Sequence, residues 1–249
     1  MRILIIFLLL VAPALAQPGD ADVQAAGKRL WQNECGGRID GLTSWNHGES
    51  FASLGIGHFI WYPAGQEGPF QESFPKLVEY LKANGAKLPA WLETTRDCPW
   101  NSRDAFMADF NGPRLKSLRR LLSETTALQA RFAAQRLSET LPKIMAELEP
   151  AEQEVIRQRF ERVRGKGIYP LLDYVNFKGE GTSPKERYHG QGWGLLQVLQ
   201  EMRDEANPLA DFSKAADRVL TRRVQNSPPE RGESRWLQGW RNRVHGYAQ

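Results

Sequence analysis

Hydrophobic side chains recur at helical spacing along most of the chain. Between residues 20 and 35 the apolar positions Val23, Ala26 and Leu30 follow a period of about 3.6 residues, Asp20 can cap the start, and Gly36-Gly37 ends the pattern. Further helices are predicted over 71–84, 102–110, 126–148, 150–164, 169–177, 191–203, from 208 onward and from about 232 onward. The chain is therefore predicted to be mostly helical.

Residues 40–63 interrupt this helical pattern. The stretch is rich in glycine, serine and asparagine, which favour turns, so short strands forming a small sheet are expected there. No internal repeat, low-complexity tract or long linker follows. We expect an α+β fold of the segregated kind, mostly helical with a small N-terminal β-hairpin region, and a single domain over 17–249.

The first sixteen residues have the layout of a signal peptide. Arg2 is followed by an apolar run over 3–11 and by Ala14-Leu15-Ala16, which is typical of a cleavage site. The run is shorter than the ~20 residues that span a bilayer, and no later segment is long and apolar enough to do so. We expect an exported protein, periplasmic or extracellular, monomeric and free of the membrane after cleavage.

The charge of the chain limits the kinds of molecule it can bind, and its cysteine content bears on disulfide formation. The formal net charge of +4 is spread along the chain without a dense Lys/Arg block, which argues against nucleic-acid binding and is compatible with an anionic polymer such as a cell wall. In an exported protein the two cysteines, Cys35 and Cys98, are expected to form a disulfide.

Glu34 is the first candidate for chemistry. Its spacing from Leu30 and Val23 places it on the buried face at the end of the first predicted helix. Burial and the negative end of the helix dipole both raise the pKa of a carboxyl there, as a general acid requires. A side chain that turns outward or pairs with an arginine is the alternative.

The residues after Glu34 resemble those of the phage-type muramidases in the lysozyme-like superfamily. Those enzymes have a catalytic Glu at the end of the first helix and a hairpin region that ends in Thr-hydrophobic-Gly-hydrophobic-Gly-His. Here the ending is Ser53-Leu54-Gly55-Ile56-Gly57-His58. Asp173 to Gly179 is similar to the Phe-Asn-x-Gly-like helix end that lines their cleft, and 236–243 to their late Arg-rich helix. Residues 86–165 have no counterpart and are expected to form a helical insertion.

The resemblance implies an enzyme that cleaves β-1,4 linkages between amino sugars in peptidoglycan, with Glu34 as the general acid. Phage-type lysozymes also carry an Asp at the position occupied here by Thr43. Asp40 and Glu49 are nearby carboxylates, and we take Glu49 as the candidate second acid because it lies closer to Ser53. A hydrolase needs such a second carboxylate, whereas the similar lytic transglycosylases typically use one Glu, so both outcomes stay open.

Several further residues are assigned to substrate. Ser53 is expected to position water or substrate, and His58 to hold the hairpin or support Ser53. Asn176 is expected to hydrogen-bond sugar groups, or else to cap its helix. We also predict substrate contacts for Trp61, Tyr62 and Glu180. The alternative for the two aromatic rings is the core, and the alternative for Glu180 is a loop exposed to solvent. Trp236 and Trp240, four residues apart, are expected in the core.

Other site chemistries have weaker support. His47, Glu49 and His58 match no recognised zinc spacing, so no metal is expected. No serine-hydrolase or dinucleotide motif is present, so no cofactor is expected. Two alternatives to a peptidoglycan-cleaving enzyme stay open. One is a non-catalytic glycan-binding module that retains the cleft, and the other is a chitinase- or chitosanase-like enzyme on the same scaffold.

Overall fold

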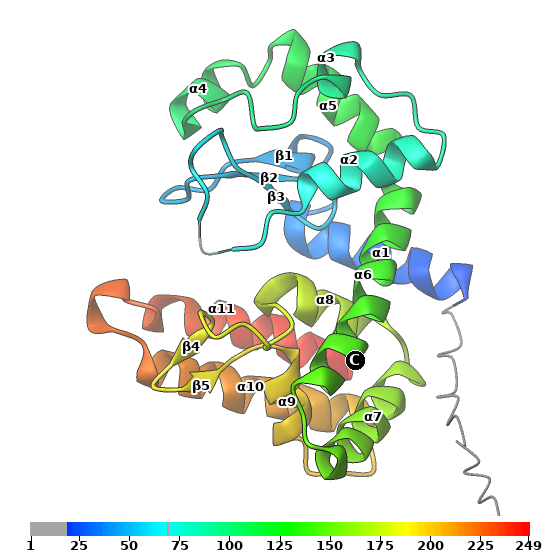
Figure 1. Ribbon diagram of the computed structural model, residues 1–249, viewed down its shortest axis with the longest axis vertical. Helices are drawn as coiled ribbons and strands as arrows, with labels where there is room; N and C mark the ends of the chain where they lie inside the picture. Colours follow the sequence, from blue (N-terminus) through cyan, green and yellow to red (C-terminus); the bar gives the residue numbers. More distant parts are fainter. Residues whose placement is uncertain (1–18, 69) are drawn as a thin grey trace, which may run out of the picture.

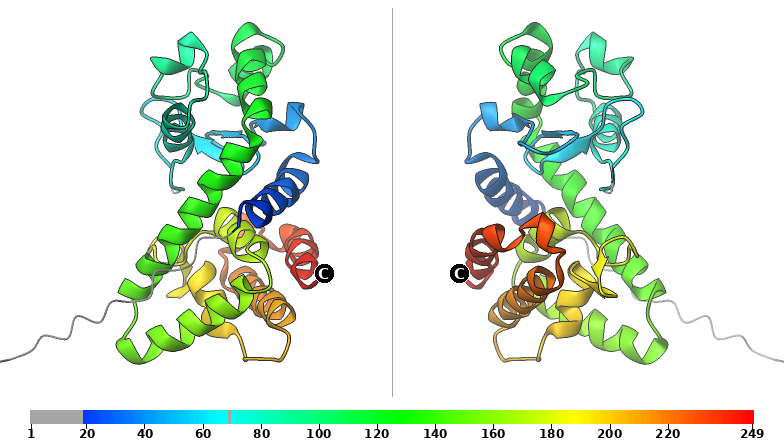
Figure 2. Two further views of the ribbon diagram at one scale, coloured as in Figure 1. Left: turned by 90° about the vertical axis from the view of Figure 1, so that its right-hand side faces the viewer. Right: turned by 90° about the vertical axis from the view of Figure 1, so that its left-hand side faces the viewer.

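A long helix, α6 (Thr126–Ala146), runs from one lobe of the molecule to the other (Figures 1 and 2). The computed structural model describes residues 19–68 and 70–249. The predicted signal peptide, 1–16, lies outside the described residues. Helix α1 (Asp20–Cys35) crosses α6 closely, since a Cβ on Gly27 would lie 2.5 Å from the Cβ of Ala130. These two helices join the lobes.

The first lobe contains the sheet. Its strands are antiparallel in the order β1-β2-β3, with Ser44 opposite Ser53 and Ser53 opposite Ile60. A 3-10 turn precedes them and four helices cover them. The elements are η1 (Asp40–Leu42), β1 (Thr43–Ser44), β2 (Ala52–Leu54), β3 (Phe59–Trp61), α2 (Phe74–Ala83), α3 (Ala90–Glu93), α4 (Arg103–Ala108) and α5 (Pro113–Glu124).

The second lobe is built almost entirely of helices (Figure 1). Asn207 caps α10 by accepting hydrogen bonds from two backbone amides of its first turn. The elements are α7 (Pro150–Arg164), α8 (Tyr169–Lys178), β4 (Arg187–Tyr188), β5 (Gln191–Gly192), α9 (Leu195–Glu201), α10 (Pro208–Asn226), η2 (Pro229–Arg231), α11 (Ser234–His245) and η3 (Gly246–Ala248).

The coarse prediction of the fold class is confirmed. The described residues form a mostly helical α+β structure with eleven α-helices and a small three-stranded sheet near the N-terminus. The predicted apolar face of α2 is buried, with Phe74, Leu77 and Leu81 inaccessible to solvent. Residues 86–165 span α3 to α7, and α6 within this range links the lobes. No helix in the described part of the chain is long and apolar enough to cross a membrane.

The helix predicted over 191–203 is wrong in its first part. Residues 187–192 form the hairpin β4–β5, and the helix α9 starts only at Leu195. The turn between the strands carries His189 and Gly190, both with positive φ, as tight hairpins require. Gly194 then lies so close to Gly181 that no Cβ would fit between the two backbones. The spacing of hydrophobic residues does not reveal these backbone constraints, so the pattern alone did not predict the hairpin.

The predicted disulfide is also wrong, because the two cysteines are not paired. The sulfur of Cys35 lies 3.5 Å from the carbonyl oxygen of Gly55, in the turn before β3. Cys98 lies beyond the other end of β3, where its backbone N–H donates to Tyr62. The length of the strand therefore separates the two thiols. Burial raises the pKa of each thiol to about 12, so both are unreactive in the folded protein.

We predict that reductant leaves the stability of the folded protein unchanged. Because Cys35 and Cys98 are free and buried, dithiothreitol has no bond to cleave, and maleimide labels both thiols only after unfolding. The check is a thermal melt with and without reductant, together with a labelling time course followed by mass. A melting temperature lowered by reductant would contradict the structure.

A buried carboxylate fixes the start of α11 to the rest of the second lobe. The side chain of Glu233 is inaccessible to solvent and accepts hydrogen bonds from Arg223 at 2.8 and 2.9 Å, Arg231 at 3.0 Å and Tyr188 at 2.9 Å. Burial raises the pKa of this carboxyl, but the hydrogen bonds and charge of Arg223, with smaller contributions from Tyr188 and Arg231, lower it to about 2. Ionised Glu233 therefore stabilises the fold.

We predict that Glu233→Gln removes an acid-sensitive part of the stability. The folded pKa of Glu233 lies below its unfolded value of about 4.3, so its contribution is complete above that pH and is lost as pH falls toward 2. The substitution should lower the free energy of unfolding by about 3 kcal/mol at pH 7 and by much less near pH 2. Urea melts at several pH values measure this, and a pH-independent difference would refute it.

Candidate functional site

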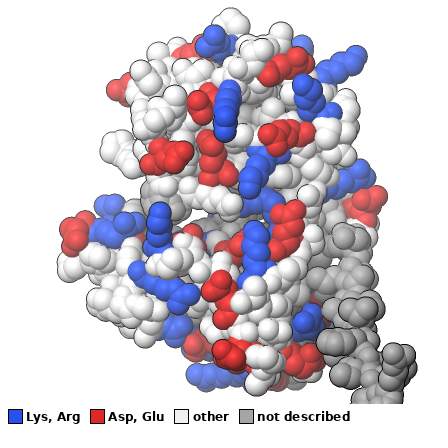
Figure 3. Space-filling model, in the orientation of Figure 1, with Lys and Arg blue, Asp and Glu red and all other residues white. Residues whose placement is uncertain are grey.

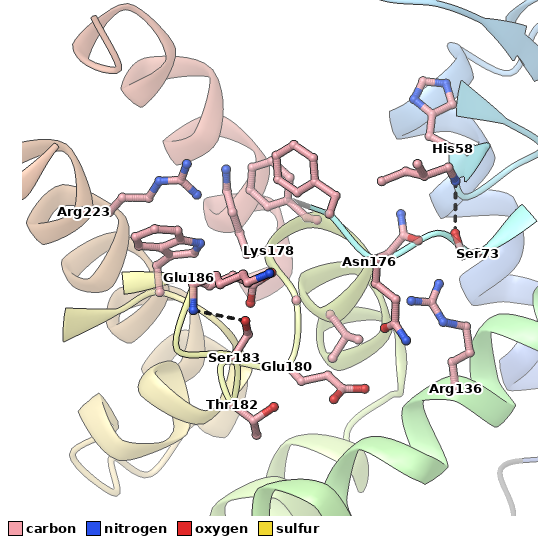
Figure 4. A pocket seen from close by; sticks show the side chains of 18 of the residues that line it. His58, Ser73, Arg136, Asn176, Lys178, Glu180, Thr182, Ser183, Glu186 and Arg223 are labelled. Atoms are coloured by element: carbon pink, nitrogen blue, oxygen red, sulfur yellow. Dashed lines mark hydrogen bonds between the residues drawn. The ribbon is translucent and has the colours of Figure 1, made fainter. Parts of the chain in front are cut away.

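A cleft between the lobes brings together residues from both. Its main cavity has a volume of about 550 Å³ and is lined from the first lobe by His58, Ile60 and Ser73, and from the second by Asn176 and the segment after it. A second cavity of about 420 Å³ shares Gln71, Ser73, Arg136 and Glu180 with the first, so the cleft continues between α2 and α6. The surface is hollowed there, with basic and acidic side chains around the hollow (Figures 3 and 4).

Glu34 lies in the last turn of α1, where Gly36 ends the helix with a left-handed backbone. Its side chain is 13% exposed. The oxygen Oε1 accepts hydrogen bonds from Arg243 of α11 and, at 3.4 Å, from Asn176 of α8. The other oxygen, Oε2, lies 3.4 Å from Nδ1 of His58. Side chains from three separate parts of the chain thus meet at one carboxylate.

Arg243 is itself held by a second, fully buried carboxylate. Its Nε and Nη2 atoms each donate to Asp173 at 2.8 Å, and the hydroxyl of Tyr247 donates to the same carboxylate. Asp173 is inaccessible to solvent. The guanidinium is therefore shared between Asp173 and Glu34, and it ties α11 to both α8 and α1.

The expected direction of the Glu34 pKa is reversed. Burial does raise the pKa of this carboxyl, but the charges of Arg243 and His58 and the hydrogen bonds from Arg243 and Asn176 outweigh burial, so the net pKa is lowered. Pairing with an arginine, the alternative considered for a helix-end glutamate, is what the structure contains. In the free protein Glu34 is held ionised.

The turn between β2 and β3 places His58 over the cleft. Gly55 has a φ of +72° and Gly57 lies where a Cβ would be 3.2 Å from the side-chain oxygen of Asn176, so this turn approaches α8 closely. His58 has a φ of +47°, and its Nε2 lies 3.5 Å from the hydroxyl of Ser44. Burial lowers the pKa of His58 more than neighbouring Glu34 raises it. His58 is therefore neutral near pH 7, and it lowers the pKa of Glu34 by its charge only when the ring is protonated.

Gln129, in the middle of α6, fixes this turn and was not singled out from the sequence. Its side chain is fully buried, and its oxygen accepts a hydrogen bond of 2.9 Å from the backbone N–H of Ile56. Its amide nitrogen donates to the carbonyl of Leu122 and to the hydroxyl of Thr125. The signal that the sequence offers for this role is a glutamine at a position of the apolar helical period, three residues before Phe132.

The two remaining predicted catalytic residues contact each other rather than Glu34. Glu49, in the loop between β1 and β2, accepts a hydrogen bond from Asn46 at 3.1 Å, and Ser53 also hydrogen-bonds its carboxylate. Burial raises the pKa of Glu49, and these hydrogen bonds only partly offset that effect. Ser53 is 3% exposed. This pair lies in the hairpin region, outside the residues that surround Glu34.

The predicted substrate contacts divide between cleft and core. Asn176 and Glu180 line the cleft, where Glu180 pairs with Lys143 at 2.7 Å. Trp61 and Tyr62 are 1% and 4% exposed and pack in the core of the first lobe, so neither ring faces the cleft. Trp236, expected in the core, is instead 40% exposed.

The residues considered above as possible metal ligands do not come together. His47 is exposed, whereas His58 faces Glu34. The described part of the chain contains no group of three His, Cys, Asp or Glu side chains that could hold a metal ion.

We predict that Gln129→Leu destabilises the protein and disturbs the site from a distance. Leucine has a similar volume, but it leaves the N–H of Ile56 and the carbonyl of Leu122 buried without their partner. Such losses cost about 1–3 kcal/mol each. Denaturant melts measure the stability, and the NMR signal of the His58 ring reports the turn. Exposed Gln238→Leu, on α11, is the control, and equal stability of the two variants would contradict this role.

Comparison with protein-family models, with curated proteins and with solved structures finds no match to this chain. The functional interpretation therefore depends on the residues around Glu34 and on the resemblance of the sequence motifs alone.

Proposed function

We propose that this protein is an exported enzyme of lysozyme-like fold that cleaves β-1,4 linkages between amino sugars in peptidoglycan, with Glu34 as the general acid. One observation carries the proposal. Three segments that resemble phage-type muramidases supply the partners of Glu34, namely His58, Asn176 and Arg243. They lie far apart in the sequence and meet beside a cleft in which the main cavity continues into a second one.

Sharing of Arg243 makes proton uptake by Glu34 feasible despite its lowered pKa. Two carboxylates, Glu34 and Asp173, face one guanidinium, so this group of three carries a net negative charge. A proton on Glu34 neutralises the group while Asp173 keeps Arg243 paired. A bound sugar that excludes water strengthens the effect of burial, which already raises the pKa of this carboxyl. Protonated Glu34 then donates to the glycosidic oxygen as the bond to the sugar carbon breaks.

The surroundings of Glu34 favour transglycosylation over hydrolysis. Glu49 is engaged by Asn46 and Ser53, Asp173 by Arg243, and Glu180 by Lys143. Asp173 shares Arg243 with Glu34, but it is fully buried and held by Arg243 and Tyr247, so it is not free to act as a second acid or base. In the proposed reaction ionised Glu34 takes a proton from a hydroxyl of the same sugar, whose oxygen then bonds to the sugar carbon and closes an anhydro ring.

A second candidate is a non-catalytic glycan-binding module. The observation that favours it is the ion pair with Arg243, which holds Glu34 ionised in the free protein. Such a module would bind the wall without releasing products.

The prediction that separates these functions uses Glu34→Gln, which keeps the shape of the side chain and removes the acid. The wild-type protein should release soluble muropeptides with anhydro ends from purified wall, and Glu34→Gln should lower the rate about 100- to 10,000-fold. Glu49→Gln should stay within a few-fold of the wild type if one carboxylate suffices. Exposed Glu124→Gln, on α5, is the matched control.

Other outcomes identify the alternatives. Reducing ends in place of anhydro ends indicate hydrolysis, and turnover of chitin oligomers but not of wall indicates a chitinase-like enzyme. Wall binding without products, unchanged in Glu34→Gln, indicates the binding module. Equal release by wild type and Glu34→Gln would refute Glu34 as the acid.

A further inference from the structure

Lys178, the last residue of α8, is a buried amino group in the wall of the cleft. The residue is only 9% exposed, and its ammonium lies 3.5 Å from the ring centre of Trp240 and 4.0 Å from that of Phe177. Among the described residues it has no ion pair and no hydrogen bond from its side chain. Burying a charge is costly unless it is paired, and a methionine would fill the same apolar space.

The neighbouring charges are already paired with one another. Arg223 lies beside Lys178 in Figure 4, but two of its nitrogens bond Glu233, and Arg243 is paired with Asp173 and Glu34. Burial and the charge of Arg223 lower the pKa of Lys178 well below its ordinary value, while Glu233 and Glu34 oppose them less strongly. Glu186 also lines the cavity but makes no ion pair with Lys178. Lys178 therefore lacks an anion.

The cavity around Lys178 is suited to an anionic group on a sugar. Its lining includes five cationic side chains, Arg136, Lys178, Lys185, Arg223 and Arg231, and two carboxylates, Glu180 and Glu186. Trp193, whose ring lies 4.2 Å from the guanidinium of Arg223, adds an aromatic wall, and Ser183 adds a hydroxyl. Lys178 lies near enough to Glu34 for their charges to interact, so an anion held there lies close to the proposed cleavage point.

We propose that Lys178 binds a carboxylate carried by the sugar polymer. This inference rests on the proposed function, since it names the part of the substrate that the cleft selects. In peptidoglycan such a carboxylate occurs on the lactyl ether of muramic acid where the peptide is absent, and on the peptide where it is present. A polymer of N-acetylglucosamine has neither.

The test compares ligands that differ only in charge and contain no glycosidic bond to cleave. N-acetylmuramic acid and its methyl ester probe the lactyl carboxylate, and muramyl dipeptide and its diamide probe the peptide carboxylates. NMR titration should show that the wild-type protein binds at least one acid about 10-fold more tightly than its neutral partner, as expected for a hydrogen bond to a charged group. Lys178→Met should abolish that preference, and exposed Lys116→Met, on α5, should preserve it.

Preference for the lactyl acid or for the dipeptide acid identifies the source of the carboxylate, and either supports the inference. Equal affinity for acid and neutral ligand, no measurable binding of any ligand, or a preference that persists in Lys178→Met would overturn it. Lys178→Met fills an apolar cage, so its thermal melt should match that of the wild type. Digestion of purified wall decides the proposed function separately, because a lack of products with the charge preference intact refutes cleavage alone.

Discussion

The structure around the cleft depends on one shared guanidinium. Arg243 pairs with buried Asp173 on α8 and with Glu34 on α1, and so joins the last long helix to the first. Loss of the arginine would leave Asp173 buried as an unpaired carboxylate, which is costly in any protein interior. The same contact fixes the geometry of Glu34 and determines its ionisation in the free protein. The stability of the fold and the proposed chemistry of Glu34 therefore both depend on the ion pairs of Arg243.

A second constraint positions the first lobe against this pair. The turn from Gly55 to His58 approaches α8 closely, and Gln129 of α6 holds its backbone by a hydrogen bond. Because α6 also runs into the second lobe, one helix fixes the turn on one side of the cleft and forms part of its wall on the other. One helix of the frame thus contributes to both sides of the cleft, and the segment 179–186 after α8 completes its lining.

Local patterns predicted the helices and the small sheet well, because amphipathic spacing and turn-forming residues act over a few positions. They also placed Glu34 and His58 at one site. They left open an arginine as the partner of Glu34 without identifying Arg243, and they missed the contact of Gln129 with Ile56. The expected disulfide was wrong because cysteine count carries no information on the strand that separates Cys35 from Cys98. Trp61 was assigned to substrate, but its burial follows from packing that no short segment specifies.

The two oxygens of Glu34 are not equivalent. Oε1 accepts from both Arg243 and Asn176, whereas Oε2 has only the contact of 3.4 Å with His58. A proton prefers the oxygen with fewer donors, so Oε2 is the atom that carries it, on the side of the first lobe. In the proposed reaction the glycosidic oxygen would therefore meet Glu34 at Oε2, on the side of His58, and the two faces of the carboxylate would not be interchangeable for a bound glycan.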